Sequence, residues 1–110
     1  MQRSDFVNFE LKLGKYFLEQ CLELSISDRE KIQKRLILLK ENPFRNKSIY
    51  SQRFNRLFRV RIELEKTAKR IIYVVIGDKI FVAGFTDRDK DYSDLDKLLQ
   101  KLEQELDSYK

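Results

Sequence analysis

Six side chains that can bind a phosphate or exchange protons with it stand in the second half of the sequence: Arg59, Arg61, Arg70, Arg88, Lys90 and Tyr92. Guanidinium groups stay charged at any working pH, and their planar donors match pairs of phosphate oxygens. Like charges repel when they gather, unless an anion neutralises them. If the fold brings these residues to one face or end of a sheet, a phosphate is the ligand we expect there.

The sequence contains no histidine and a single cysteine. Acid–base or triad chemistry based on histidine is therefore excluded, and a zinc site would need Cys21 and carboxylates. Cys21 stands at helical spacing from Phe17 and Leu24, which predicts a packing residue and not a nucleophile.

Three alternating aspartates invite a metal-site interpretation: Asp87, Asp89 and Asp91. A calcium loop needs Gly at its sixth position and Glu at its twelfth, where this chain has Tyr92 and Leu98. Arg88 and Lys90 interleave with the aspartates and offset their field, which also disfavours magnesium. We therefore expect neither a metal nor another cofactor.

Positive charge is concentrated in the middle of the chain. The net charge is +5, and residues 44–73 hold nine basic residues against two acidic ones. From residue 86 onward the balance reverses, with five basic and eight acidic residues. A basic region of this kind suits a polyanion such as nucleic acid. The alternative is that the arginines pair with nearby carboxylates (Glu63, Glu65, Asp87 or Asp91) and only solvate the sheet.

Three β-strands must position the arginines. Apolar residues alternate along 57–64, which places Arg59 and Arg61 on the face opposite the apolar row. Apolar, β-branched and aromatic residues predict two further strands at 70–76 and 80–85. A tight hairpin at Gly77-Asp78 joins these two, while the turn at 65–69 is predicted to be longer.

Helices are predicted on both sides of these strands. A short strand at 7–13, able to pair at a sheet edge, precedes a helix starting after Gly14. A capping box at Ser27–Glu30 predicts a second helix that ends before Pro43. A last helix starting near Ser93 carries a leucine stripe that we expect to pack on the sheet.

The segment 44–56 is predicted to be a loop, held to the core by Ile49, Tyr50 and Phe54. With 110 residues, 42% of them apolar and 37% charged, the chain is predicted to form one domain, 1–110. The fold class is α+β: an N-terminal strand and helical hairpin packed on a small antiparallel sheet, with a C-terminal helix. No apolar run has membrane-spanning length and no signal peptide is recognised, so we expect a cytoplasmic protein without a membrane partner.

Taken together, these motifs resemble the RelE/ParE toxin superfamily, and its RelE-like mRNA interferase branch in particular. The resemblance rests on the helix ending before Pro43, the arginine strands, the Gly-Asp turn, and Arg88 followed four residues later by Tyr92. It implies a toxin of a type II toxin–antitoxin system, an endoribonuclease that cleaves mRNA on the ribosome without a metal and inhibits translation. Its expected partners are a cognate antitoxin, mRNA and the ribosome.

Residue by residue, Arg61 and Arg70 match family arginines on the sheet, and Arg88 and Tyr92 match the arginine and aromatic residue near the family's end. In the implied mechanism the ribose 2′-OH attacks the neighbouring phosphate, and the three arginines stabilise the charge that develops. Tyr92 stacks on a base or assists proton transfer, and Lys90 or Lys69 acts as the acid. The expected RNA-binding residues are Lys47, Arg53, Arg56, Arg59 and Lys69.

The chain departs from the family pattern in having Glu63 where a glycine is common, no catalytic histidine, and a helix that runs well past Tyr92. Two other functions remain open at this stage. One is a ParE-like inhibitor of DNA gyrase, in which the arginines serve only structure or surface charge. The other is a non-catalytic RelE-like binding protein whose leucine-rich last helix mediates assembly.

Overall fold

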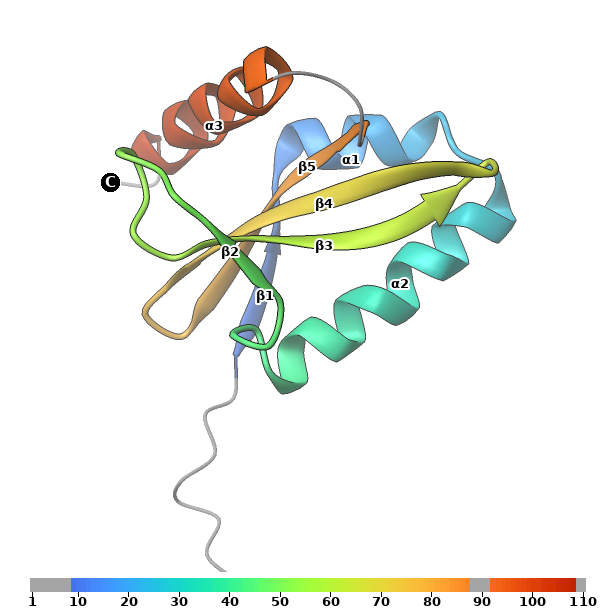
Figure 1. Cartoon of the computed structure of the whole chain (residues 1–110), viewed down its shortest axis with the longest axis horizontal. Helices are drawn as coiled ribbons and strands as arrows, with labels where there is room; N and C mark the ends of the chain where they lie inside the picture. Colours follow the sequence, from blue (N-terminus) through green and yellow to red (C-terminus); the bar gives the residue numbers. More distant parts are fainter. Residues whose placement is uncertain (1–8, 88–91, 109–110) are drawn as a thin grey trace, which may run out of the picture.

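The computed structural model describes residues 9–87 and 92–108 as five strands and three helices (Figure 1). In chain order these are β1 (Glu10–Leu13), α1 (Lys15–Leu22), α2 (Ile26–Glu41), β2 (Lys47–Ile49), β3 (Leu57–Leu64), β4 (Thr67–Ile76), β5 (Lys79–Asp87) and α3 (Tyr92–Asp107). One sheet holds all the strands in the order β1-β5-β4-β3-β2. The predicted α+β fold class is confirmed.

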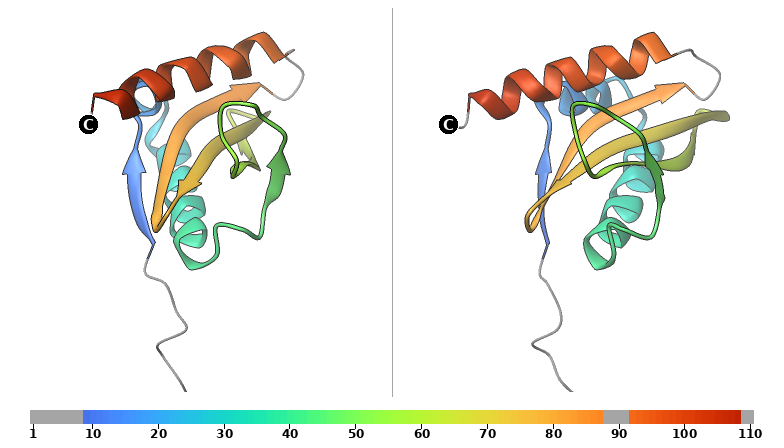
Figure 2. Two further views of the ribbon diagram at one scale, coloured as in Figure 1. Left: turned by 90° about the vertical axis from the view of Figure 1, so that its left-hand side faces the viewer. Right: turned by 60° about the vertical axis from the view of Figure 1, so that its left-hand side comes forward.

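The sheet separates two apolar layers (Figure 2). Even-numbered residues of β3, such as Val60 and Ile62, pack with α1 and α2. Leu57, on the alternate face, packs in the layer that contains α3. The alternation of side chains along a strand therefore decides which residues lie on the α3 side.

Both hairpins of the central sheet are tight. Gly77 has φ of 61°, and the turn that it forms joins β4 to β5, as the sequence predicts. The β3–β4 turn is shorter than predicted, because β3 runs to Leu64 and β4 already begins at Thr67. Glu65 and Lys66 take φ of 52° and 62°, a left-handed conformation that non-glycine residues seldom adopt. This two-residue turn fixes the register between the arginine strands.

The two edge strands are short. β1 pairs at an edge, as predicted, parallel to β5, and begins at Glu10; residues 7 and 8 of the predicted strand lie outside the described residues. The segment predicted as a loop contains β2, which pairs antiparallel to β3. Ile49 and Phe54 do contact the core, but Tyr50 is 86% exposed, so its predicted role as an anchor is wrong.

The N-cap of α2 lies two residues before Ser27, the N-cap of the predicted capping box. The Ser25 hydroxyl accepts a hydrogen bond from the backbone N–H of Asp28 at 3.2 Å, so Ser25 is the N-cap. The helix buries Ile32, Leu36 and Leu39, and ends at Glu41 before Pro43.

The C-terminal helix α3 packs its leucine stripe against the other face of the sheet, as predicted. Leu98, Leu99 and Leu102 are buried there. No helix in the described ranges, 9–87 and 92–108, is long and apolar enough to cross a bilayer.

Candidate functional site

Four basic residues lie together on the α3 side of the sheet, in the half formed by β2, β3 and β4. Arg61 stands directly opposite Arg70 across the β3–β4 pair, and Lys47 stands opposite Arg59 across β2–β3. Arg59 and Arg61 are two residues apart on one strand, so they share a face. We call Lys47, Arg59, Arg61 and Arg70 the cationic row.

Directly opposed residues on antiparallel strands have Cβ atoms about 4.5–5.5 Å apart. Arg61 and Arg70 therefore extend from neighbouring points of one surface. Arg61 is exposed, while Arg59 and Arg70 are half-buried. Like charges in this relation are destabilising unless an anion lies between them.

Within the described ranges, no carboxylate forms an ion pair with any member of the cationic row. Asp87, a carboxylate that the sequence offered as a partner for the arginines, forms its ion pair with Lys69. Glu63 and Glu65 form no ion pair with any residue in this part of the chain. Within the described ranges the charged groups of the row therefore have no ion-pair partner, which is the arrangement that phosphate oxygens satisfy.

A polar residue of β5 lies next to the cationic row on the side towards α3. Thr86 of β5 stands opposite Arg70 on β4 and shares its face. Thr86 also lines a cleft of about 230 Å³ between the end of β5 and the first half of α3, together with Lys97 and Lys101. The cleft is mixed in charge, because Lys69, Asp87 and Asp94 line it too.

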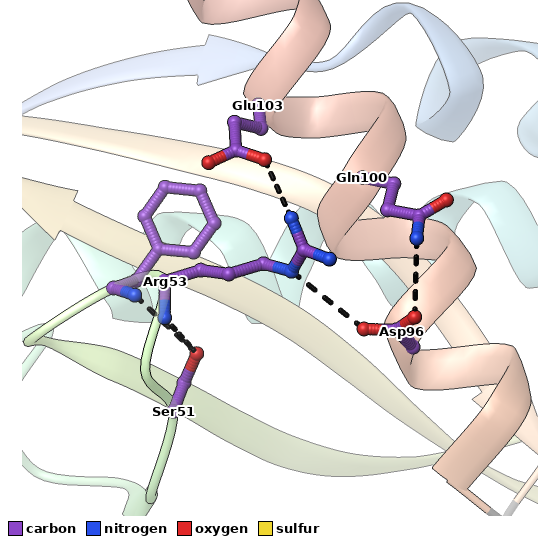
Figure 3. Close-up of polar contacts among 6 residues, drawn as sticks. Ser51, Arg53, Asp96, Gln100 and Glu103 are labelled. Atoms are coloured by element: carbon purple, nitrogen blue, oxygen red, sulfur yellow. Dashed lines mark hydrogen bonds and ion pairs between the residues drawn. The ribbon is translucent and has the colours of Figure 1, made fainter.

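Arg53, predicted to bind RNA, forms its ion pairs with carboxylates of α3 (Figure 3). Its Nη1 donates a hydrogen bond to Glu103 Oε1 at 2.6 Å, and its Nε lies 3.6 Å from Asp96 Oδ1. Gln100 donates a further hydrogen bond to Asp96 at 3.2 Å. The Arg53 guanidinium joins the β2–β3 loop to the helix and is set apart from the row.

Two other predicted RNA-binding residues also lie away from the row. Arg56 lies over the Phe44 ring, with 5.4 Å between its guanidinium carbon and the ring centroid. Lys69 extends from the opposite face of β4 and forms a 2.5 Å ion pair with Asp87. The structure therefore brings together Lys47, Arg59, Arg61 and Arg70, but not Arg53, Arg56 and Lys69.

The remaining predicted site residues, Arg88 and Lys90, lie outside the described residues. Tyr92 is the first residue of α3, but its side chain is not among those described. β5 ends at Asp87, one residue after Thr86, which stands opposite Arg70, and α3 begins at Tyr92.

Tyr73 is a buried phenol that sequence reasoning did not single out. Its hydroxyl donates to the carbonyl of Pro43 at 2.6 Å and accepts from Asn46 Nδ2 at 3.0 Å. Burial raises the pKa of Tyr73, against the effect of the Asn46 hydrogen bond. Both hydrogen bonds hold the chain after α2 onto β4, so Tyr73 has a structural role on the face away from the cationic row.

Cys21 is half-buried against the α1–α2 core, and burial raises the pKa of its thiol. A raised pKa lowers the fraction of thiolate at neutral pH, which agrees with the packing role predicted from its spacing. No group of three metal-ligating side chains occurs in the part of the chain that the structure describes.

Comparison with protein-family models gives no match, and comparison with curated proteins gives none either. Among solved structures, the E. coli toxin RelE in the free state, as a variant with two arginines replaced by alanine, matches with a TM-score of 0.60 at 20% identity. That match covers 87% of this chain and 94% of the RelE chain.

Two complexes give similar results. The intact E. coli RelBE toxin–antitoxin complex matches with a TM-score of 0.57 at 21% identity, over 74% of this chain and 99% of the matched chain. The same RelE variant bound to a peptide of the antitoxin RelB matches with a TM-score of 0.59 at 20% identity, over 82% of this chain and 93% of the matched chain. At this level of identity, the likeness establishes that the chain has the RelE-like fold.

Proposed function

We propose that this RelE-like chain is the toxin of a type II toxin–antitoxin system and acts in the cytoplasm as a metal-free endoribonuclease that cleaves mRNA on the ribosome. The observation that carries the proposal is the cationic row. Three arginines and a lysine share one sheet face, and no described carboxylate forms an ion pair with them. The fold that surrounds the row is one found in a toxin that has been solved with its antitoxin.

The chemistry follows from the row's charge. Attack of the ribose 2′-oxygen on the adjacent phosphorus breaks the bond to the 5′-oxygen, giving a 2′,3′-cyclic phosphate and a 5′-hydroxyl end. A proton must leave the 2′-OH and another must reach the 5′-oxygen. Arg61 and Arg70 bind the non-bridging oxygens and stabilise the negative charge of the phosphorane, while Arg59 and Lys47 bind a flanking phosphate.

The proton-transfer roles are assigned to residues near the end of β5. Tyr92 stacks on a base or assists proton transfer, Lys90 acts as the acid, and Arg88 adds a third guanidinium. Lys69 takes no part, because it extends from the opposite face of the sheet and is paired with Asp87. None of these groups is well matched to neutral pH, so the ribosome contributes by holding the mRNA in line for attack.

The partner that restrains such a toxin is an antitoxin. Since the row is positive and unpaired in the described chain, an antitoxin segment that carries acidic side chains is the complement that we propose for it.

The test uses ribosomes programmed with a defined mRNA, with cleavage mapped by primer extension. Arg61→Ala and Arg70→Ala should each lower the cleavage rate at least about 100-fold, the cost of losing one donor to a developing oxyanion. Lys34→Ala and Lys40→Ala, which remove exposed charges from α2 on the opposite side of the sheet, are the matched controls and should cleave normally.

Full cleavage activity of both arginine variants would refute a role for the cationic row in catalysis. If the wild-type chain leaves mRNA intact but stops DNA supercoiling by gyrase, the ParE-like function replaces the one proposed. If it does neither and does not arrest growth, the chain is a non-catalytic relative.

A further inference from the structure

Among the large hydrophobic side chains that the structure describes, Tyr50 is the most exposed, at 86%, and it follows directly after β2. It lines a hollow of about 390 Å³ between the β2–β3 loop and the first half of α3. Leu95 and Leu99 contribute apolar surface to this hollow, and Gln52 contributes an amide. A flat aromatic ring beside apolar and amide groups offers both a stacking surface and hydrogen bonds to a base edge.

The loop that carries Tyr50 is anchored at several points (Figure 3). The Ser51 hydroxyl accepts hydrogen bonds from the backbone N–H groups of Arg53 at 3.0 Å and Phe54 at 3.3 Å. Phe54 packs into the core on the α3 side, and the Arg53 guanidinium holds α3 through Glu103. These contacts fix the backbone beside Tyr50, so less conformational entropy of the loop is lost when a ligand binds.

The hollow lies next to the cationic row. Lys47, three residues before Tyr50, stands opposite Arg59, and Ile49 stands opposite Leu57. Three residues of chain span at most about 10 Å. A nucleotide whose phosphate is bound by Lys47 and Arg59 can therefore reach Tyr50 with its base or with that of its neighbour.

We propose that Tyr50 is the stacking platform of a nucleobase site, next to the phosphate sites of the cationic row. The inference rests on the proposed function, because it assumes that RNA lies across the row. It assigns Arg53 a positioning role, since that side chain holds the loop and meets carboxylates instead of phosphates. Gln52 is the residue placed to distinguish one base from another.

The test uses the absence of tryptophan from the sequence. In a Tyr50→Trp variant the indole is the only such fluorophore, and a base that stacks on it should quench its emission. The titrant is a 2′-O-methyl RNA oligonucleotide, which cannot be cleaved because its 2′-oxygen is blocked. A Phe44→Trp variant is the control, since Phe44 is half-exposed and packs on Phe58, whose side chain is on the other face of the sheet.

Quenching in the Tyr50→Trp variant, with the same midpoint as RNA binding followed by fluorescence anisotropy, is the expected result. The Phe44→Trp control should stay unquenched. RNA binding without a change in the Tyr50→Trp emission would overturn the inference and leave the proposed function standing.

Affinity gives a second measurement. Tyr50→Ala should weaken binding of the oligonucleotide roughly 5- to 160-fold, the usual range for one stacked base, while Tyr50→Phe keeps it. An abasic sugar–phosphate chain should bind wild type and Tyr50→Ala equally, because it has no base to stack. Equal affinity of wild type and Tyr50→Ala for the base-containing RNA would refute the base site, whereas failure of wild type to cleave mRNA on programmed ribosomes would refute the proposed function itself.

Discussion

Repulsion between the opposed arginines Arg61 and Arg70 should lower the free energy of unfolding of the protein. Arg61 faces Arg70 across β3–β4, and no described carboxylate pairs with either of them. Replacing Arg61 by Gln removes one of the two charges. Because Arg61 is exposed, the substitution gives up little packing. We predict that Arg61→Gln raises the free energy of unfolding.

The size of the gain follows from the cross-strand relation. A pair of like charges directly opposite each other lowers the free energy of unfolding by about 0.2–1 kcal/mol. For a chain of 110 residues this corresponds to roughly 1–4 °C in the midpoint of thermal unfolding. The repulsion is between partly exposed charges, so the gain should shrink as ionic strength rises from about 0.01 to 1 M and the Debye length falls from about 30 to 3 Å.

Urea unfolding at low and high salt measures this gain, and a double-mutant cycle isolates it. Arg61→Gln and Arg70→Gln each relieve the same repulsion, so the double variant should gain less than the sum of the two singles. Lys34→Gln on α2 is the control for the loss of one exposed charge, and should change stability by less than about 0.5 kcal/mol. A loss of more than about 1 kcal/mol in Arg61→Gln, equal at both salt concentrations, would show that Arg61 is a structural residue and refute the reasoning.

Three further predictions concern the parts that support the site. Tyr73→Phe should lower the free energy of unfolding by about 1–2 kcal/mol, because the Pro43 carbonyl loses its donor. Since burial raises the pKa of Tyr73, its contribution is present below about pH 10 and is lost as pH rises further, so wild type should lose stability in alkali more steeply than Tyr73→Phe in urea titrations. Gly84→Ala should cost about 1–3 kcal/mol by the same assay, because φ is 154° and a Cβ would lie 2.7 Å from Leu98 Cδ2; an unchanged midpoint would contradict this close contact. Arg53→Gln should change global stability by no more than about 1 kcal/mol yet speed trypsin cleavage within the β2–β3 loop, and unchanged cleavage would argue against its anchoring role.

The sequence predicts much of the arginine arrangement because a strand has a strict two-residue period. Apolar residues at alternate positions of 57–64 place Arg59 and Arg61 on one face, and the structure has them there. The opposition of Arg61 to Arg70 depends on the length of the intervening turn. That turn could not be read from the chain, because Glu65 and Lys66 are not residues that signal a left-handed turn.

The sequence did not predict very short elements or contacts between residues far apart in the chain, because local patterns do not show them. β2 has three residues, too few to show a period, so Lys47 was predicted in a loop. The Arg53 ion pairs join residues 43 and 50 positions apart, and only the packed fold shows them. Tyr50 was expected to be buried because it is aromatic, but residue type alone does not show which of two neighbouring apolar residues contacts the core.

NMR of arginine side chains tests the central claim most directly, because each Nε–Hε signal reports its own guanidinium. Titration with a 2′-O-methyl RNA oligonucleotide should shift the signals of Arg59, Arg61 and Arg70 together, with one saturation midpoint. Arg29, which donates hydrogen bonds to the Cys21 and Leu22 carbonyls, should keep its position. Unmoved signals from the three sheet arginines, in a protein that binds the oligonucleotide, would contradict the account.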